Sequence, residues 1–199
     1  MTPTPADVDE RGCDAAVIER SWAEPESFAL LFDRHAARVH RYVARRLGQD
    51  LADDVVGETF LIAFRRRVEY DTTRSEALPW LYGIASRLVS KHRSAEVRFY
   101  RLLARTGVDP VLESHEVRAD AKVTAQAAHR ALATALARLE PRDRDVLLLI
   151  AWADLSYEAV AQTLDIPVGT VRSRLNRARR LMRAALGTDP TDILEKDTP

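Results

Sequence analysis

Apolar residues recur every three or four positions along most of this chain, the spacing at which one face of an α-helix repeats. One such stretch covers 26–47 and stops before Gly48, and a second covers 51–67, where arginines occupy the last turn and complement the helix dipole. A third helix is predicted from Pro79, because proline suits the first turn of a helix. No stretch alternates apolar and polar residues as a half-buried strand does, so the sequence predicts an all-α protein.

The same helical spacing returns in the second half of the chain. A long helix is predicted over 121–139, and a leucine-rich helix follows Pro141. Ser156 offers an N-cap for the short helix YEAVAQTL, and the last helix begins at Val168 and closes at Gly187.

The periodicity weakens between these halves, over 96–120, where Gly, Pro and acidic residues combine as they do in linkers. Residues 1–25 and 188–199 are acidic and carry no apolar period, so we expect disordered tails there. The sequence thus predicts two small helical domains, 26–95 and 121–187, joined by a flexible linker.

The end of the second domain has the pattern of a helix-turn-helix, in which YEAVAQTL, the break DIP and VGTVRSRLNRARR follow one another. At about 100° per residue, the apolar side chains of its second helix form one stripe and the polar ones lie opposite. Arg pairs with guanine, Asn pairs with adenine, and Ser and Arg both hold phosphate. A solvated basic helix would carry the same arginines, but the preceding helix and turn favour DNA recognition. The stripe consists of Val168, Val171, Leu175, Ala178 and Met182, and the candidate DNA-binding residues are Arg172, Ser173, Arg174, Asn176, Arg177 and Arg180.

The charge of the chain bears on nucleic-acid binding only when it is counted segment by segment. The chain has 30 basic and 30 acidic residues, and its net charge of zero predicts no affinity for nucleic acid. However, residues 34–106 carry 15 basic and 8 acidic side chains, and residues 156–186 carry 6 and 2. The acidic excess lies at the ends, with 2 basic and 8 acidic residues in 1–33 and 1 and 4 in 187–199. Two basic regions between acidic ends are typical of a polyanion-binding protein.

The sequence offers no recognisable catalytic chemistry. It contains no Walker loop, GxGxxG or HExxH motif, and its five histidines lack the spacing of metal ligands, so we expect no enzyme activity, cofactor or metal. The single cysteine, Cys13, has no partner for a disulfide, which fits a reducing compartment. No apolar run approaches the roughly 18 residues of a membrane span, and the N-terminus lacks the pattern of a signal peptide. We therefore expect a cytoplasmic protein without membrane insertion.

The segment SYEAVAQTLDIPVGTVRSRLNRAR resembles the promoter-binding C-terminal domain of bacterial RNA polymerase sigma factors, sigma-70 family, extracytoplasmic-function (ECF) group. LADDVVGETFLIAF and ALPWLYGIASRLVSKHR resemble the N-terminal domain of the same group, and the motifs keep the family order across about 26–186. The resemblance implies a non-catalytic initiation subunit that binds core RNA polymerase, at the clamp of the largest subunit and the flap of the second largest. It would read the upstream (minus-35) promoter element with its C-terminal domain, and melt and read the downstream (minus-10) element with its N-terminal domain.

The resemblance also assigns roles to residues of the N-terminal domain. The acidic helix start would bind the polymerase clamp, although a merely solvated acidic helix would look the same, and Gly57 stands where relatives usually have Gln. The loop 68–76 would capture a base flipped out of the minus-10 element, with Tyr70 as a wall of the pocket, while Trp80 and Tyr82 would line the track of the single strand. Trp80 also fits a core position. The clamp-binding residues are Asp53, Asp54 and Glu58, and the minus-10 residues are Tyr70, Asp71, Thr72, Thr73, Arg74, Arg87, Lys91 and Arg93.

Two other functions fit parts of the pattern. A dimeric helix-turn-helix regulator would bind DNA without polymerase, but it would have no use for an acidic clamp-binding helix and a strand-melting loop. A helical adaptor protein is disfavoured by the arginines opposite Val171 and Leu175. The resemblance further implies an anti-sigma factor that holds the protein inactive, and a monomer when the protein is free.

Overall fold

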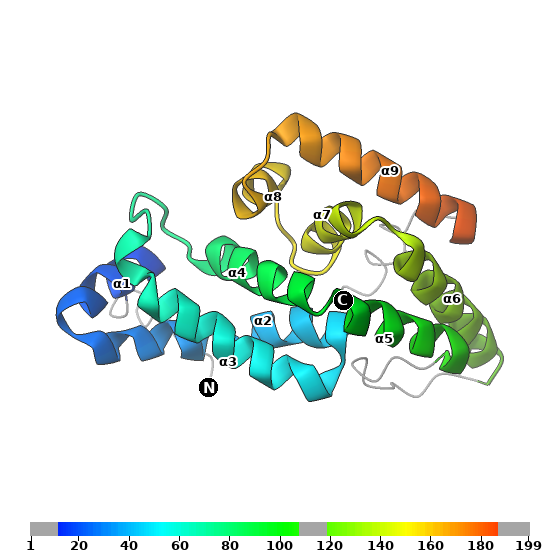
Figure 1. Ribbon diagram of the computed structural model, residues 1–199, viewed down its shortest axis with the longest axis horizontal. Helices are drawn as coiled ribbons and strands as arrows, with labels where there is room; N and C mark the ends of the chain where they lie inside the picture. The colour runs from blue at the N-terminus through cyan, green and yellow to red at the C-terminus, as the bar shows by residue number, and fades with distance from the viewer. Residues whose placement is uncertain (1–11, 108–118, 187–199) are drawn as a thin grey trace.

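The computed structural model describes residues 12–107 and 119–186, and all regular elements in these ranges are helical, which confirms the predicted all-α class (Figure 1). Seven α- and 3-10 helices of the first domain precede residues 108–118, and four α-helices of the second domain follow them in the described part. In chain order the elements are α1 (Asp14–Ala23), η2 (Pro25–Phe28), α2 (Ala29–Leu47), α3 (Gln49–Arg65), η3 (Arg67–Glu69), α4 (Leu78–Lys91), α5 (Arg93–Thr106), α6 (Ala119–Arg138), α7 (Pro141–Ala151), α8 (Tyr157–Leu164) and α9 (Val168–Leu186).

Helices α2, α3 and α4 form the centre of the first domain because their apolar stripes face one another. Val43, Val55 and Leu81, one from each helix, are buried in a shared core. Gly48 makes the turn from α2 to α3 with φ of 85°, and a Cβ at this position would lie 3.1 Å from the ring of Phe99. Glycine is therefore required by both the backbone conformation and the packing of α5 against this turn.

The prediction that residues 1–25 form a disordered tail is wrong for 14–23, which form helix α1, while residues 1–11 lie outside the described part. Val17 and Ile18 are completely buried. Helix α1 has only 10 residues, too few for the apolar spacing to stand out among its acidic neighbours. The carbonyl oxygen of Ser21 accepts a hydrogen bond from Arg67, at 3.2 Å, and thereby joins α1 to η3.

Asp14, at the start of α1, is a buried anchor for two other segments. Its carboxylate lies 3.0 Å from a guanidinium nitrogen of Arg34, 2.7 Å from Nε2 of His35 and 2.9 Å from the donating backbone N–H of Ala77. Burial raises the pKa of Asp14, but the bonds from His35, Ala77 and Arg34 outweigh it and lower the pKa to about 2. A carboxylate is thus held ionised where α1, α2 and the start of α4 meet.

Residues 93–106, most of which fall in the predicted linker, form helix α5, and α6 begins again at Ala119. The expected irregular linker is therefore wrong for 96–106, and 108–118 lie outside the described residues. The buried positions of α5 include Glu96 and Tyr100, so its inward face is partly polar. A search for apolar periodicity cannot detect such a face.

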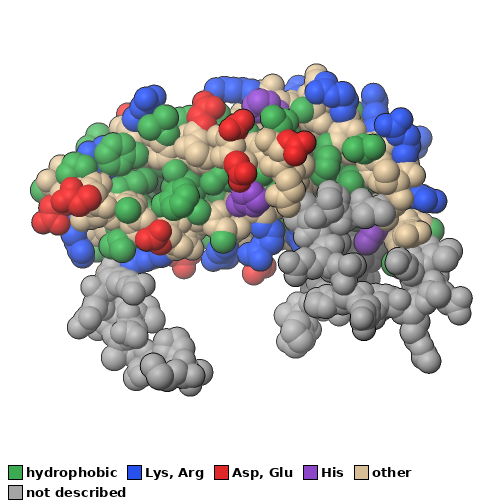
Figure 2. Space-filling model, turned by 90° about the horizontal axis from the view of Figure 1, so that it is seen from below, with side chains coloured by type: hydrophobic (Ala, Val, Ile, Leu, Met, Phe, Trp, Pro, Cys, Tyr) green, Lys and Arg blue, Asp and Glu red, His purple; other side chains and the backbone are tan. Residues whose placement is uncertain are grey.

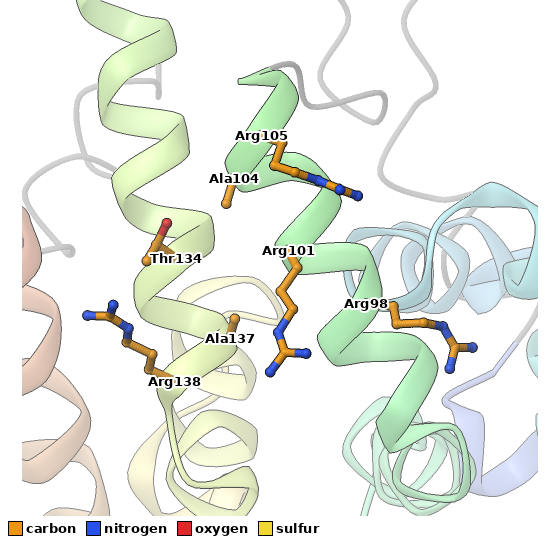
Figure 3. Close-up of a pocket in the computed structure, with 7 residues that line it drawn as sticks. All are labelled: Arg98, Arg101, Ala104, Arg105, Thr134, Ala137 and Arg138. Carbon is orange, nitrogen blue, oxygen red and sulfur yellow. The ribbon is translucent and has the colours of Figure 1, made fainter.

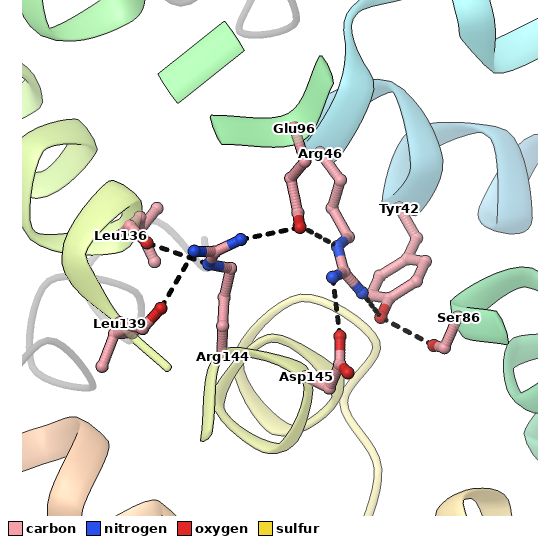
Figure 4. A network of polar contacts seen from close by, with 8 residues as sticks. All are labelled: Tyr42, Arg46, Ser86, Glu96, Leu136, Leu139, Arg144 and Asp145. Carbon is pink, nitrogen blue, oxygen red and sulfur yellow. Dashed lines mark hydrogen bonds and ion pairs between the residues drawn. The ribbon is translucent and has the colours of Figure 1, made fainter. Parts of the chain in front are cut away.

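The two domains meet across a buried ionic network (Figure 4). The carboxylate of Glu96 on α5 accepts from Nε of Arg46 on α2 and from a guanidinium nitrogen of Arg144 on α7, each at 2.7 Å. Arg46 also reaches Asp145 of α7 at 2.6 Å. The side chains of Arg46, Glu96 and Arg144 are only 1%, 2% and 1% exposed, so these charges are almost completely removed from water.

The remaining polar atoms of this network are also satisfied, as burial of charge requires. Arg144 donates to the carbonyl oxygens of Leu136 and Leu139 at 2.9 and 3.0 Å, and Arg46 donates to the Tyr42 hydroxyl at 2.7 Å. Burial lowers the pKa of Arg46, but its neighbours Tyr42, Glu96 and Asp145 outweigh this effect and raise the pKa well above the usual value. The arginine therefore stays charged inside the interface.

A second contact between the domains brings α8 onto α4. Thr163 Oγ1 donates to the carbonyl oxygen of Pro79 at 3.1 Å. A Cβ at Gly83 would lie 2.9 Å from the Thr163 carbonyl oxygen, closer than real Cβ atoms approach backbone. The glycine thus permits the first helix of the helix-turn-helix to touch the helix that follows the 68–76 loop.

The Asp14 anchor should make stability depend on pH. Because the pKa of Asp14 is lowered from 3.8 to about 2 in the folded protein, its stabilisation is complete above about pH 4 and is lost as the pH falls toward 2. We expect Asp14→Asn to lower the free energy of unfolding at pH 7 by about 2 kcal/mol, and the difference from wild type to shrink below pH 4. Urea unfolding at pH 7, 4 and 3 measures this, and a difference that does not change with pH would contradict it.

The ionic network should hold the domains together. Glu96→Gln leaves Arg46 and Arg144 buried without their shared carboxylate, and breaking a buried ion pair in this way costs about 3–5 kcal/mol. We expect the domains to separate while their helices persist, so that the radius of gyration in small-angle scattering rises and the helical circular dichroism stays. Glu69→Gln is the matched control because Glu69 forms an exposed pair with Arg66 at 2.9 Å. Equal radii for wild type and Glu96→Gln would show that the network does not maintain the closed arrangement.

Candidate nucleic-acid and polymerase interfaces

Helices α8 and α9 form the predicted helix-turn-helix. Ser156 caps α8, since its side chain accepts from the Ala159 N–H at 3.1 Å, as its position in the sequence indicates. The turn to α9 passes through Asp165 with φ of 53°, a left-handed conformation that Asp tolerates better than most residues. The two helices are therefore held at a fixed geometry by a cap and a turn that the chain itself encodes.

Helix α9 presents the polar face that the periodicity predicts. Val171, Leu175, Ala178 and Met182 are buried, whereas Val168 is only partly buried. The opposite side is open to solvent. Its exposed residues are Arg172, Ser173, Asn176, Arg177 and Arg180, and Arg174 is partly exposed.

Arg177 differs from its neighbours because it already has a partner. Its guanidinium makes two bonds of 2.9 Å to both carboxylate oxygens of Asp143, a buried residue at the start of α7. These bonds and the charge of Asp143 raise the pKa of Arg177. The pair fixes α9 against α7 and orients Arg177, while Arg172 and Asn176 extend from the helix without any such bond within the described residues.

The loop after η3 is shaped by Tyr70, which the family resemblance predicts as the wall of a base pocket. The Tyr70 side chain is buried, its ring lies 5.0 Å from that of Trp80, and its hydroxyl lies 2.8 and 2.9 Å from the carbonyl oxygens of Arg74 and Glu76. Burial raises the pKa of Tyr70 to about 12, so the hydroxyl keeps its proton and can donate. Tyr70 therefore closes the loop from inside, with its ring against Trp80.

The rim of this loop consists of polar side chains. Asp71 accepts from both the backbone N–H and the hydroxyl of Thr73, at 3.2 and 2.6 Å, and from Arg74 at 3.1 Å. The bonds from Thr73 come first among the causes that lower the pKa of Asp71. Asp71, Thr73 and Arg74 are exposed and Thr72 is partly exposed, so four of the five predicted loop residues reach the surface.

Helix α4 divides its predicted residues between core and surface. Leu81 is buried and Trp80 is partly buried, and Tyr82, which we expected along the DNA track, is buried against Tyr42 with ring centres 5.1 Å apart. Tyr82 is a core residue because its position falls on the inner face of the helix. The basic residues on the other side are exposed; they are Arg87, Lys91 and, at the start of α5, Arg93.

The acidic residues of α3 lie on an exposed face beside apolar side chains. Asp53 lies 3.1 Å from Nε2 of His40, Glu58 lies 3.8 Å from Nζ of Lys91, and Asp54 has no ion pair with any described residue. Phe32 of α2, whose ring packs against that of Phe60 of α3, is 46% exposed, and Leu61 of α3 is 47% exposed. Figure 2 shows the underside of the molecule, where hydrophobic side chains gather toward the left end, acidic side chains lie at that end and across the middle, and Lys and Arg are most frequent at the right end.

Gly57 leaves an open place on this acidic face. It is exposed, and no heavy atom lies within 4 Å of a Cβ built on it. A side chain such as that of Gln would therefore fit without displacing a neighbour.

The described residues contain no group of three or more possible metal ligands. No helix in the same part of the chain is both long and apolar enough to span a bilayer.

Comparisons with known proteins identify the family of the chain. The Sigma-70 region 2 family matches residues 31–99, and the Sigma-70 region 4 family matches residues 129–182. The ECF RNA polymerase sigma factor SigL of Mycobacterium tuberculosis is 32% identical over 174 residues, which cover 86% of this chain and 96% of SigL. The ECF sigma factor BldN of Streptomyces coelicolor is 30% identical over 177 residues, covering 87% of this chain and 66% of BldN.

Two solved structures share the fold. CnrH in complex with the cytosolic domain of CnrY matches with a TM-score of 0.60 and 21% identity, over 93% of this chain and 99% of CnrH. The sigma factor RpoE of Bartonella quintana, in complex with the anti-sigma factor NepR, matches with a TM-score of 0.56 and 20% identity, over 82% of this chain and 99% of RpoE. With both sigma-70 regions present in order and a full-length relative above 30% identity, the chain belongs to the ECF group of bacterial RNA polymerase sigma factors.

Proposed function

We propose that this protein binds core RNA polymerase and directs it to promoters by contacting a minus-35 element with α9 and a minus-10 element with the 68–76 loop. The observation that carries the proposal is the split of α9 into a buried apolar stripe and an exposed face of Arg, Ser and Asn. Such a face suits base edges in a major groove. The match to both sigma-70 regions supports polymerase-dependent action over a stand-alone regulator.

The residues of α9 have different roles in this proposal. Arg172 and Asn176 extend freely and are the best candidates for base recognition, while Ser173, Arg174 and Arg180 hold phosphates. Arg177 has its guanidinium oriented by Asp143, and its 55% exposed side chain leaves room for one further contact with DNA. Asp143 is then a positioning residue for the DNA-binding helix.

The loop and the exposed side of α4 would act on the minus-10 element. Asp71, Thr72, Thr73 and Arg74 form the rim that meets an extruded base, and Tyr70 and Trp80 keep the rim in shape from beneath. Arg87, Lys91 and Arg93 follow the phosphates of the separated strand. Strand separation costs a few kcal/mol, which a preformed loop can offset because it need not be ordered on binding.

Asp53, Asp54 and Glu58 would bind the clamp of the largest polymerase subunit, and the second domain would bind the flap of the second largest. Exposed Phe32 and Leu61 add the apolar surface that a stable protein interface needs. The same surfaces would be covered by an anti-sigma factor that keeps the protein inactive. The solved structure of RpoE with the anti-sigma factor NepR supports this part of the proposal.

Recognition of the minus-35 element should depend on Asn176 and Arg172. We expect Asn176→Ala and Arg172→Ala to lower the preference for the cognate element over a scrambled one by 1–3 kcal/mol, about 5- to 150-fold. Run-off transcription with core polymerase, on templates that differ only in the upstream element, measures this preference. Arg142→Ala is the control, since Arg142 is an exposed arginine on α7 outside the α9 face. Unchanged discrimination in both α9 variants would remove α9 as the recognition helix.

Binding to core polymerase should depend on the acidic face of α3. We expect Asp54→Ala to weaken holoenzyme formation by about 1 kcal/mol or more, roughly fivefold, and Gly57→Gln to strengthen it because the side chain has free space. Native mass spectrometry or fluorescence titration with labelled core polymerase gives both affinities. Glu158→Ala, an exposed acidic residue on α8, is the control for charge alone. An Asp54→Ala affinity equal to that of the control would place the polymerase contact elsewhere.

A further inference from the structure

A cleft of about 580 Å³ lies between α5 and α6, at the end of the molecule opposite the 68–76 loop (Figures 1 and 3). Two small residues, Ala104 and Ala137, leave the space open between the helices, and Thr134 adds a hydroxyl. The other lining residues are all arginines: Arg98, Arg101 and Arg105 from α5 and Arg138 from α6.

These arginines have no anionic partner in the described part of the chain. None of the four takes part in an ion pair or side-chain hydrogen bond there. The only acidic residue of α5 is Glu96, which is buried and engaged by Arg46 and Arg144, and residues 125–138 of α6 contain no acidic residue. Like charges destabilise a protein where they gather, so the described residues around the cleft carry a positive charge that a bound anion would offset.

The positions of the guanidinium groups suit an extended anion. Figure 3 shows Arg101 reaching into the space between the helices, Arg98 and Arg105 pointing to one side of it, and Arg138 pointing to the other side from α6. The guanidinium groups thus point in different directions instead of converging on one point. Several anionic groups along a chain can therefore each meet one arginine, which a single small anion cannot do.

The composition of the cleft favours carboxylates over nucleic acid. Single-stranded nucleic acid is normally held by aromatic side chains that stack on bases, and the lining contains none. A DNA duplex would touch only the rim of a cleft of this volume, which is in the range of sites for small ligands. Guanidinium groups, in contrast, pair bidentately with carboxylates, and the alanines let a peptide backbone come close.

We infer that the α5/α6 cleft binds an acidic segment of a partner protein and that its occupant stabilises the closed arrangement of the two domains. The cleft exists only when the domains are closed, because its two walls come from different domains. Arg98, Arg101 and Arg105 lie on α5 of the first domain, and Arg138 lies on α6 of the second. A ligand that contacts both walls binds the closed state better than the open one, and by reciprocity it makes opening harder. The site lies outside the surfaces proposed for promoter and polymerase, and its regulatory effect on transcription rests on that proposed function.

The site can be tested with a fluorescein-labelled octaglutamate peptide and the full-length protein. Fluorescence anisotropy at low salt should show binding that weakens at least tenfold in Arg101→Ala and in Arg138→Ala, one from each wall. Arg142→Ala removes an exposed arginine elsewhere and should change the affinity less than twofold. An equal loss in the control, or no loss in either cleft variant, would overturn the site.

A second variant tests the link to the closed state. Glu96→Gln keeps all four cleft arginines but breaks the contact between the domains, so octaglutamate affinity should fall at least tenfold. An affinity equal to that of wild type would overturn the stabilisation of the closed state. Changing the four acidic residues of 187–199 to amides should leave the octaglutamate affinity unchanged. A tenfold tightening would show that this segment of the chain itself fills the cleft, and it would overturn the assignment to a partner.

Nucleic acid is the alternative occupant of the cleft, and a separate binding experiment tests it. A labelled 12-base-pair duplex of random sequence should bind Arg101→Ala and Arg138→Ala as well as it binds wild type, and a tenfold loss in both would assign the cleft to DNA. Run-off transcription keeps the two proposals apart. The cleft variants should retain minus-35 discrimination with core polymerase, whereas failure of the proposed function would appear as absent transcription in wild type itself.

Discussion

The closed shape of this protein depends on one carboxylate, that of Glu96, which is bound by an arginine from each domain. Without it, two guanidinium groups would lie in an interior that is almost free of water. The pairing of α5 with α6 and the contact of α8 with α4 both require the domains to be in this relative position. A single charged group buried in the interface therefore determines which other surfaces meet, including the arginine cleft.

The sequence allowed most of the fold to be predicted, because most helices bury one apolar stripe. The predicted boundaries of the helix-turn-helix agree with α8 and α9, since Ser156 and the DIP turn provide clear signals at their ends. Helix α1 was missed because it is short, and α5 because its inner face is partly polar; in both helices an acidic residue, Asp14 or Glu96, also faces inward. Periodicity predicts that charged residues lie on the outer face of a helix. It does not reveal partners that are distant in the sequence, such as Arg34 for Asp14, 20 residues away, and Arg46 for Glu96, 50 residues away.

The candidate site, like the fold, could be predicted from the sequence only in part. Exposure of the polar face of α9 followed from helix geometry, and the structure agrees with it at Arg172, Ser173 and Asn176. The pairing of Arg177 with Asp143 and the inward position of Tyr70 could not be predicted, because both depend on contacts with other elements or with backbone carbonyl groups. The roles of these residues toward DNA and polymerase stay predictions.

The charges of the interface are distributed in a way that suits repeated opening. The first domain contributes Arg46 and Glu96, which are bonded to each other at 2.7 Å, and the second contributes Arg144 and its neighbour Asp145. When the domains part, each one keeps one positive and one negative group, so neither newly exposed surface has a net charge from this network. Each domain surface is therefore neutral in this network after separation. The same contact can form again without rearranging either domain.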